Sequence, residues 1–216
     1  MHKSTLHHSK RKNLRDDNTI QDTMTILVEQ IKACGSLDES EVEQIQSVLK
    51  YEIFLKNLYL FESSRICDRL YFLVSGSLHL FETDHNEVKR IKQFAVDGWW
   101  ITDFSAFHSK EPTKCKLLAF ENSICLSISY EDYFKLIEHI PTVSNYFRKI
   151  YQDFFILCQD LFFAAVQNDG KGSYLYITEK YPALLQRIPL YQIASFLGVT
   201  PVLISNIRKQ IFKKQD

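Results

Sequence analysis

The chain has 216 residues, 45% of them apolar and 24% charged, a composition that excludes a disordered, collagen-like or low-complexity protein. No apolar run approaches the roughly 18–20 residues of a membrane-spanning helix, and none follows the basic N-terminus as in a secretory signal. We therefore expect a cytoplasmic protein of one large or two small domains that binds no membrane.

The formal net charge is zero, but the charges are unevenly distributed. Residues 1–15 hold five basic and no acidic side chains, and residues 180–215 hold six basic and no acidic ones. Residues 16–179 carry 15 basic and 25 acidic side chains. This asymmetry favours contact between the C-terminal stretch and a polyanion; the alternative is a solvated basic face beside an acidic body. We expect residues 1–18 to be a disordered basic tail.

The first predicted elements are two helices. Apolar spacing predicts a helix over 22–33, and Gly35 ends it. Asp38 is predicted to cap the second helix, with Glu41 completing a capping box. From residue 51 to 129 short runs of aromatic and branched residues alternate with turn signals. They predict an antiparallel barrel or jelly roll, with two strands joined at a tight turn at Gly76.

A helix is predicted over 130–140, and a long helix over about 142–167. Apolar residues in the long helix recur at alternating spacings of four and three for three heptads, which predicts a two-helix interface. We expect this seam to join two copies of the chain through Val143, Phe147, Ile150, Phe154, Leu157 and Leu161. The alternative is that the helix packs on its own barrel, a role that we assign to the flanking Phe155, Ile156, Phe162 and Phe163.

A linker is predicted at 168–172, then a short helix over 173–180 and a connector over 184–189. Residues 190–209 follow with the pattern of a helix-turn-helix. Gly198 allows a left-handed cap, Thr200 caps the second helix and Pro201 occupies its first position. The residues predicted to face inward are Ile193, Ala194, Leu197, Leu203, Ile204 and Ile207. A generic αα-hairpin is the alternative, but the turn chemistry and the acid-free charge favour DNA binding.

The stretch PALLQRIPLYQIASFLGVTPVLISNIRK at 182–209 resembles the C-terminal DNA-binding domain of the Crp/Fnr family, the relatives of the cyclic-AMP receptor protein. The order upstream, with its LYFLVSGSLHLF motif, extends the resemblance over about 19–216. The resemblance implies an α+β fold: an antiparallel β-roll sensor domain at 19–140, a dimerisation helix at 141–167 and a winged helix-turn-helix at 168–216. It also implies a homodimeric transcription regulator that binds double-stranded DNA, with RNA polymerase as a further partner of an activator.

Residues 98–113 match the position of the family's ligand-binding cassette, and we call this stretch the cassette. Its residues depart from the family's pattern. The family's cyclic-nucleotide-binding members have a Gly-Glu-Leu start and a later Arg-Ser/Thr pair that holds the cyclic phosphate. Gly98 and Thr113 are kept, but tryptophan stands where Glu is wanted and Pro112 where Arg is wanted. Because a buried phosphate needs a charge-assisted partner, we expect no usual cyclic-AMP binding and no cofactor. The replacing residues either line an apolar pocket for an unknown small effector or fill the core: Trp99, Trp100, Phe104 and Phe107, with Thr113.

The second helix of the helix-turn-helix is predicted to read DNA. Asn206 can pair with adenine, Val202 can touch a thymine methyl, and Ser205 can contact either base. Phosphate contacts are assigned to Thr200, Arg208 and Lys209. Together these residues predict an A/T-leaning half-site.

Two other functions compete with the regulator. A chain that had lost base readout would act as a protein-interaction module, and the Pro201-Val202 pair favours this slightly. An enzyme would need a metal site or a catalytic constellation. His79, His85 and His108 lack the paired arrangement of a cupin site, and the five scattered cysteines form no CxxC pair. We therefore expect neither a metal site nor an enzyme.

Overall fold

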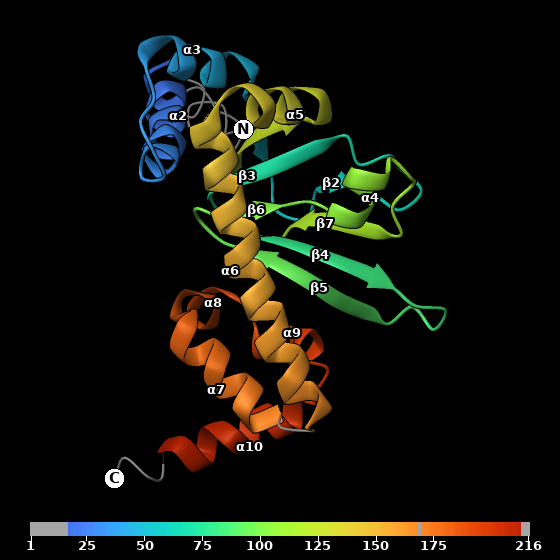
Figure 1. Ribbon diagram of the computed structural model, residues 1–216. Helices are drawn as coiled ribbons and strands as arrows, with labels where there is room; N and C mark the ends of the chain where they lie inside the picture. The colour runs from blue at the N-terminus through green and yellow to red at the C-terminus, as the bar shows by residue number, and fades with distance from the viewer. Residues whose placement is uncertain (1–16, 168–169, 213–216) are drawn as a thin grey trace, which may run out of the picture.

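The computed structural model describes residues 17–167 and 170–212 (Figure 1). Its helices are α2 (Asp17–Lys32), α3 (Glu39–Val48), α4 (Phe104–Ser109), α5 (Tyr130–His139), α6 (Pro141–Val166), α7 (Gly170–Lys180), α8 (Pro182–Arg187), α9 (Leu190–Phe196) and α10 (Pro201–Phe212). Its strands are β1 (Lys50–Phe54), β2 (Tyr59–Phe61), β3 (Arg69–Ser75), β4 (Leu78–Thr83), β5 (Lys89–Ala95), β6 (Trp100–Ile101), β7 (Cys115–Ala119) and β8 (Ser123–Ser129).

The strands form two four-stranded sheets of antiparallel pairs, in the orders β1-β8-β3-β6 and β2-β7-β4-β5. Alternation along a strand sends successive side chains to opposite faces. Thus Leu70 and Phe72 of β3 pack outward against helices, whereas Tyr71 and Leu73 pack inward against the second sheet. The antiparallel roll predicted from the sequence is confirmed, and its interior is filled by apolar side chains.

The tight turn at Gly76 joins two strands, as predicted, but these strands do not pair with each other. β3 lies in the first sheet and β4 in the second, so the turn carries the chain from one layer to the other. Gly76 adopts a φ of 115°, and a Cβ there would lie 2.3 Å from Ser123 Oγ. Both the backbone conformation and the close approach of β8 therefore require glycine.

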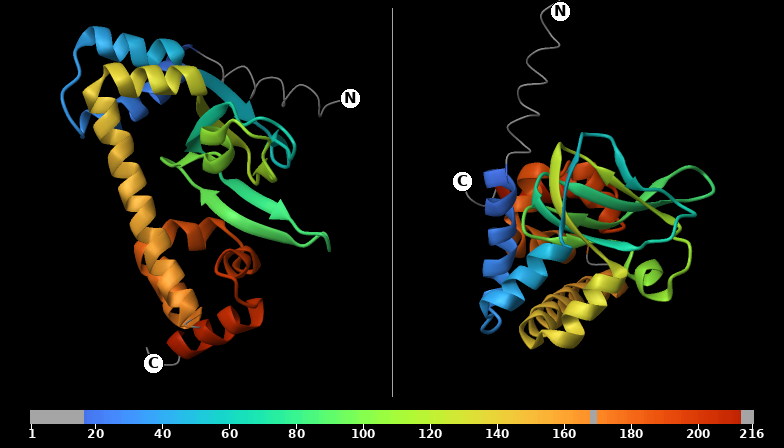
Figure 2. Two further views of the ribbon diagram at one scale, coloured as in Figure 1. Left: turned by 45° about the vertical axis from the view of Figure 1, so that its right-hand side comes forward. Right: turned by 90° about the horizontal axis from the view of Figure 1, so that it is seen from above.

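Helices α2, α3 and α5 gather at one end of the roll, and their apolar faces share one core with the outer face of the first sheet (Figures 1 and 2). The predicted capping box is confirmed, because the Glu41 amide donates to Asp38 Oδ1 at 2.8 Å and the Asp38 amide donates to Glu41 Oε2 at 2.9 Å. From this end the 26-residue α6 runs alongside the roll to the C-terminal helices (Figure 1).

Several local predictions need correction. The helix α4 was not expected inside the cassette, and α8 replaces the predicted connector. The helix α7 begins at Gly170, inside the predicted linker, and residues 168–169 lie outside the described residues. Residues 170–212 form helices without a strand, so the part of the C-terminal domain that the structure describes has no wing. The predicted tail lies outside the description up to residue 16, while α2 begins at Asp17.

Candidate nucleic-acid interface and effector region

The helices α9 and α10 form a sharply bent pair with an angle of 111°. Gly198 between them has a φ of 68°, in the left-handed region that favours glycine, as predicted. The Val199 amide donates to the Ala194 carbonyl at 3.0 Å, which closes the turn. The predicted cap is also confirmed, because the Leu203 amide donates to the Thr200 hydroxyl at 3.2 Å. The angle lies within the range of a helix-turn-helix.

Burial divides α10 into two faces. Ile204 and Ile207 are buried with Ile193 and Ala194 of α9, as predicted. Leu203 is an exception, because its side chain is 40% exposed. It packs against Gly170 at the start of α7, where an added Cβ would lie 3.0 Å from Leu203 Cδ2. The side chains assigned to DNA are exposed together on the opposite side and at the N-terminus of α10: Thr200, Val202, Ser205, Asn206, Arg208 and Lys209.

The C-terminal helices are docked on the second sheet of the roll. Phe94 of β5 packs on Phe196 of α9, with ring centroids 5.4 Å apart. The Ser195 hydroxyl donates to the Lys89 carbonyl at 3.2 Å and accepts from the Ile91 amide at 3.3 Å. One hydrophobic core includes side chains from β5, α6 and α7–α10. The roll and the C-terminal helices therefore share one core.

Salt bridges also join the roll to the C-terminal helices. Arg187 at the end of α8 donates to Asp97 Oδ1 at 2.8 Å and to Glu121 Oε2 at 2.6 Å, both on loops of the roll. Burial opposes the charge of Arg187, but the hydrogen bonds that it donates to these two carboxylates, together with their negative charges, raise its pKa. One of the six cations in the acid-free stretch is thus engaged with the chain itself. Sequence reasoning counted it toward DNA, since the carboxylates that bind it lie 66 and 90 residues away.

The long helix α6 corrects the predicted dimer seam. Val143, Phe147 and Leu157 are buried in this chain, and Ile150, Phe154 and Leu161 pack partly buried against the same two cores. The flanking residues that were assigned to the chain's own barrel are instead exposed: Phe155, Ile156, Phe162 and Phe163. The heptad spacing was real, but it marks the face that packs on the roll. Periodicity identifies an apolar face without saying what covers it.

The cassette holds a buried carboxylate where the resemblance places a phosphate-binding hydroxyl. The Thr113 hydroxyl donates to Asp103 Oδ2 at 2.6 Å, and Lys92 Nζ lies 3.9 Å from Asp103 Oδ1. Burial alone raises the pKa of Asp103, but hydrogen bonds from Thr113 and Cys115 and the charge of Lys92 hold it below its usual value. Asp103 is therefore an anion built into the cassette. No pattern in the sequence indicated this role.

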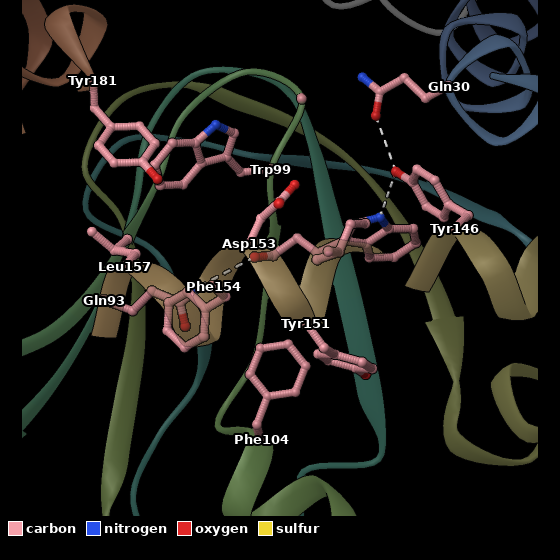
Figure 3. Close-up of a pocket in the computed structure, with 13 residues that line it drawn as sticks. Gln30, Gln93, Trp99, Phe104, Tyr146, Tyr151, Asp153, Phe154, Leu157 and Tyr181 are labelled. Atoms are coloured by element: carbon pink, nitrogen blue, oxygen red, sulfur yellow. Dashed lines mark hydrogen bonds between the residues drawn. The ribbon is translucent and has the colours of Figure 1, made fainter. Parts of the chain in front are cut away.

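The aromatic residues of the cassette divide between core and cavity. Phe107 is fully buried and Thr113 is buried beside Asp103, and neither is among the residues that line the cavity. Trp99 and Phe104 do line it, between the roll and α6 (Figure 3), and Trp100 is a further lining residue. The Trp100 indole also donates to the Tyr146 hydroxyl at 3.0 Å. Trp99, Trp100 and Phe104 thus line a cavity, whereas Phe107 and Thr113 belong to the buried interior.

The described residues form neither a metal-ligand cluster nor a single helix of membrane-spanning length and hydropathy. Among the described residues no three His, Cys, Asp or Glu side chains come together as a metal site would require. In the same part of the chain no single helix is long and apolar enough to cross a membrane; α9 and α10 meet that test only as a bent pair.

Comparisons with known proteins agree with this architecture. Residues 51–139 match the family model of the cyclic nucleotide-binding domain. A search of curated protein sequences finds no match. Among solved structures, a mutant of CooA from Carboxydothermus hydrogenoformans is similar with a TM-score of 0.61 and 14% identity, over 86% of this chain and 84% of that one.

Two other solved structures are similar over most of their length. The regulator CLP of Xanthomonas campestris, described as c-di-GMP-responsive, has a TM-score of 0.56 and 15% identity, over 82% of this chain and 93% of its own. The catabolite activator protein of Thermus thermophilus has a TM-score of 0.53 and 16% identity, over 86% and 88%. Residues 51–139 thus match the cyclic nucleotide-binding domain, and the chain as a whole shares its fold with these three solved proteins.

Proposed function

We propose that the protein is a homodimeric transcription regulator that binds double-stranded DNA through α10. The observation that carries this proposal is the geometry of α9 and α10: a 111° bend, a left-handed glycine in the turn and a capped second helix whose polar face is exposed. A helix presented in this way can enter a major groove with its N-terminal residues against the base edges.

The exposed side chains of α10 favour a particular kind of site. Asn206 offers an amide that pairs with adenine N6 and N7, and Val202 offers an apolar contact to a thymine methyl. We assign phosphate contacts to Arg208 and Lys209, two exposed cations of α10. We therefore propose an A/T-leaning half-site.

The dimer in this proposal uses the exposed face of α6. Phe155 and Phe162 are 67% and 71% exposed and lie seven residues apart, so they lie on one face of the helix. Ile156, Phe163 and Val166 extend the same face and are each more than half exposed. A contiguous apolar stripe of this kind on a soluble protein favours a partner, and a second α6 packed on it would bury the stripe in both copies.

The cassette favours a regulator without a cyclic-nucleotide effector. The Asp103 carboxylate already occupies the Thr113 hydroxyl and lies near Lys92. A cyclic phosphate placed there would meet a like charge without the arginine that usually compensates it. We expect no binding of cyclic AMP in calorimetry; a dissociation constant below about 10 μM, near −7 kcal/mol, would contradict this.

A selection from random duplex DNA with the purified protein tests DNA recognition. We expect a palindrome whose A/T-rich half-sites lie about one helical turn apart. Asn206→Ala should lose the preference at one position per half-site, while Gln186→Ala, a matched change on the exposed side of α8, should keep it. Enrichment of G/C-centred half-sites would contradict the assigned readout. Binding that is salt-sensitive but enriches no motif would limit α10 to phosphate contacts.

Light scattering during size-exclusion chromatography tests the dimer. We expect two copies per particle for the native chain and one for the double variant Phe155→Ser/Phe162→Ser. Val88→Ser, which removes an exposed apolar side chain from the β4–β5 loop, is the control and should remain dimeric. A dimer that survives the double variant would exclude this face of α6 as the interface.

One observation favours a protein partner over DNA. The exposed part of the helix-turn-helix carries three apolar side chains, since Val202 is 69% exposed and Tyr191 and Leu203 are also exposed. Such a surface is more apolar than phosphate contacts require. If the selection yields no bound DNA at low salt, the interaction module becomes the better description of this chain.

A further inference from the structure

A cavity of about 230 Å³ lies where the roll, the helices α2 and α6 and the start of the C-terminal helices meet (Figure 3). Trp99 and Trp100 come from the roll, Asp153 from α6, Gln30 from α2 and Tyr181 from the segment before α8. The volume lies below the roughly 300–1,000 Å³ of pockets for drug-sized ligands. Any occupant is therefore small.

The walls of this cavity are mainly aromatic. Seven of its thirteen lining residues are Trp, Tyr or Phe. The rings of Trp99 and Tyr181 meet at 78° with centroids 5.3 Å apart, and those of Phe104 and Tyr151 meet at 83° and 5.6 Å. Rings set at right angles form the corners of an aromatic cage. The faces of such rings are electron-rich and attract cations.

The cavity has one charged lining residue, and it is acidic. Asp153 is exposed at the rim, and Figure 3 shows its carboxylate pointing from α6 into the space between Trp99 and Gln30. The structure gives it no ion pair within the described ranges 17–167 and 170–212. Burial first, and then the charges of Asp153 and Asp160, raise the pKa of Tyr181.

Two glutamines of the lining each use one side-chain atom in a hydrogen bond within the chain. Gln30 Oε1 accepts a hydrogen bond from the Tyr146 hydroxyl at 3.0 Å, and Gln93 Nε2 donates to the Trp100 carbonyl at 3.3 Å. No Lys or Arg is among the lining residues. An anion would therefore find no cationic side chain in the lining, and it would meet the carboxylate of Asp153.

We propose that this cavity binds a small organic cation, an ammonium ion with methyl or aryl substituents. The ring faces would contact the apolar substituents, and Asp153 would balance the charge. This inference concerns a ligand and goes beyond the proposed DNA binding, on which it does not depend. Because the walls come from the roll, from α6 and from the segment before α8, an occupant contacts all three parts. A bound cation would thereby favour the docked arrangement of the roll and the C-terminal helices.

Intrinsic fluorescence provides the experiment, because the chain has two tryptophans and both line the cavity. The full chain is titrated, without DNA, with benzyltrimethylammonium chloride and, for comparison, with benzyl alcohol and sodium phenylacetate. We expect a saturable change with the cation, a dissociation constant about fivefold or more higher for the alcohol, and no saturation with the anion. A linear, collisional response to the cation, or equal affinity for phenylacetate, would overturn the proposal.

Two matched variants test whether the carboxylate of Asp153 binds the cation. Asp153→Asn keeps the shape of an exposed side chain and should weaken binding of the cation about fivefold, while leaving benzyl alcohol unchanged. Asp22→Asn removes an exposed carboxylate from α2 outside the cavity and should leave both affinities unchanged. Equal cation affinity in the native chain and in Asp153→Asn would refute the role of Asp153. Failure of the DNA selection would leave all of these results unaffected.

Discussion

The salt bridge of Arg187 is expected to be a measurable part of the energy that docks the C-terminal helices on the roll. Its side chain is 28% exposed, and those of Glu121 and Asp97 are 35% and 53% exposed. Exposed ion pairs contribute about 0.2–1 kcal/mol, and charge-assisted hydrogen bonds up to about 3 kcal/mol. With both carboxylates partly hydrated, we take about 1 kcal/mol for Glu121 and about 0.5 kcal/mol for Asp97. Arg187→Met should therefore cost about 1.5 kcal/mol.

Urea unfolding followed by tryptophan fluorescence measures this loss, because Trp99 packs on Tyr181 and so reports docking. A double-mutant cycle of Arg187→Met with Glu121→Gln should give a coupling energy of about 1 kcal/mol at 0.1 M salt. At 1 M salt, where the Debye length falls from about 10 to about 3 Å, the coupling should fall by half or more.

The exposed pair of Lys32 and Glu29 on α2 provides the control. Its charged atoms lie 3.0 Å apart, and its side chains are 43% and 61% exposed, so Lys32→Met should cost under about 0.5 kcal/mol. The reasoning fails if the Arg187 cycle gives less than about 0.3 kcal/mol, or if its coupling is insensitive to salt.

Three further predictions concern the roll. Burial lowers the pKa of His79 to about 3, so on acidification the imidazole is protonated in the unfolded chain before it is protonated in the folded one. The contribution of His79 to the free energy of unfolding is therefore fully present above about pH 6.5. Below that pH it falls by up to about 1.4 kcal/mol per pH unit. His79→Phe should remove that slope from urea midpoints measured between pH 4 and 7, and an unchanged slope would contradict the assignment. Gly76→Ala should cost about 3 kcal/mol or more, because its Cβ would meet Ser123, whereas Gly198→Ala, with nothing within 4 Å, should cost only about 1 kcal/mol in a thermal melt. Similar costs for the two variants would argue against the close approach. Asp103→Ala should cost about 1–3 kcal/mol in the same melt, because it leaves a buried hydroxyl without its acceptor; a neutral result would argue against a built-in anion.

Sequence reasoning identified the elements whose causes are local. The Asp38 capping box, the glycine turn before Thr200 and the inward faces of Ile193 and Ile204 depend on residues within about one helical turn of each other. The same holds for the alternating strands of the roll. Propensity, capping and turn chemistry act over such distances, so the sequence by itself was sufficient for them.

The tertiary structure alone decided which apolar face of α6 is covered and which cations are engaged. The heptad seam was visible in the sequence, but only the packed roll shows that it buries Val143 and Phe147 and leaves Phe155 and Phe162 exposed. From the sequence, Arg187 was counted among the cations available to DNA, but in the structure it pairs with two carboxylates that lie far away in the chain. Asp103 and Asp153 became informative only once their neighbours were in place. These outcomes depend on contacts between residues far apart in the chain, and periodicity and composition carry no information about such contacts.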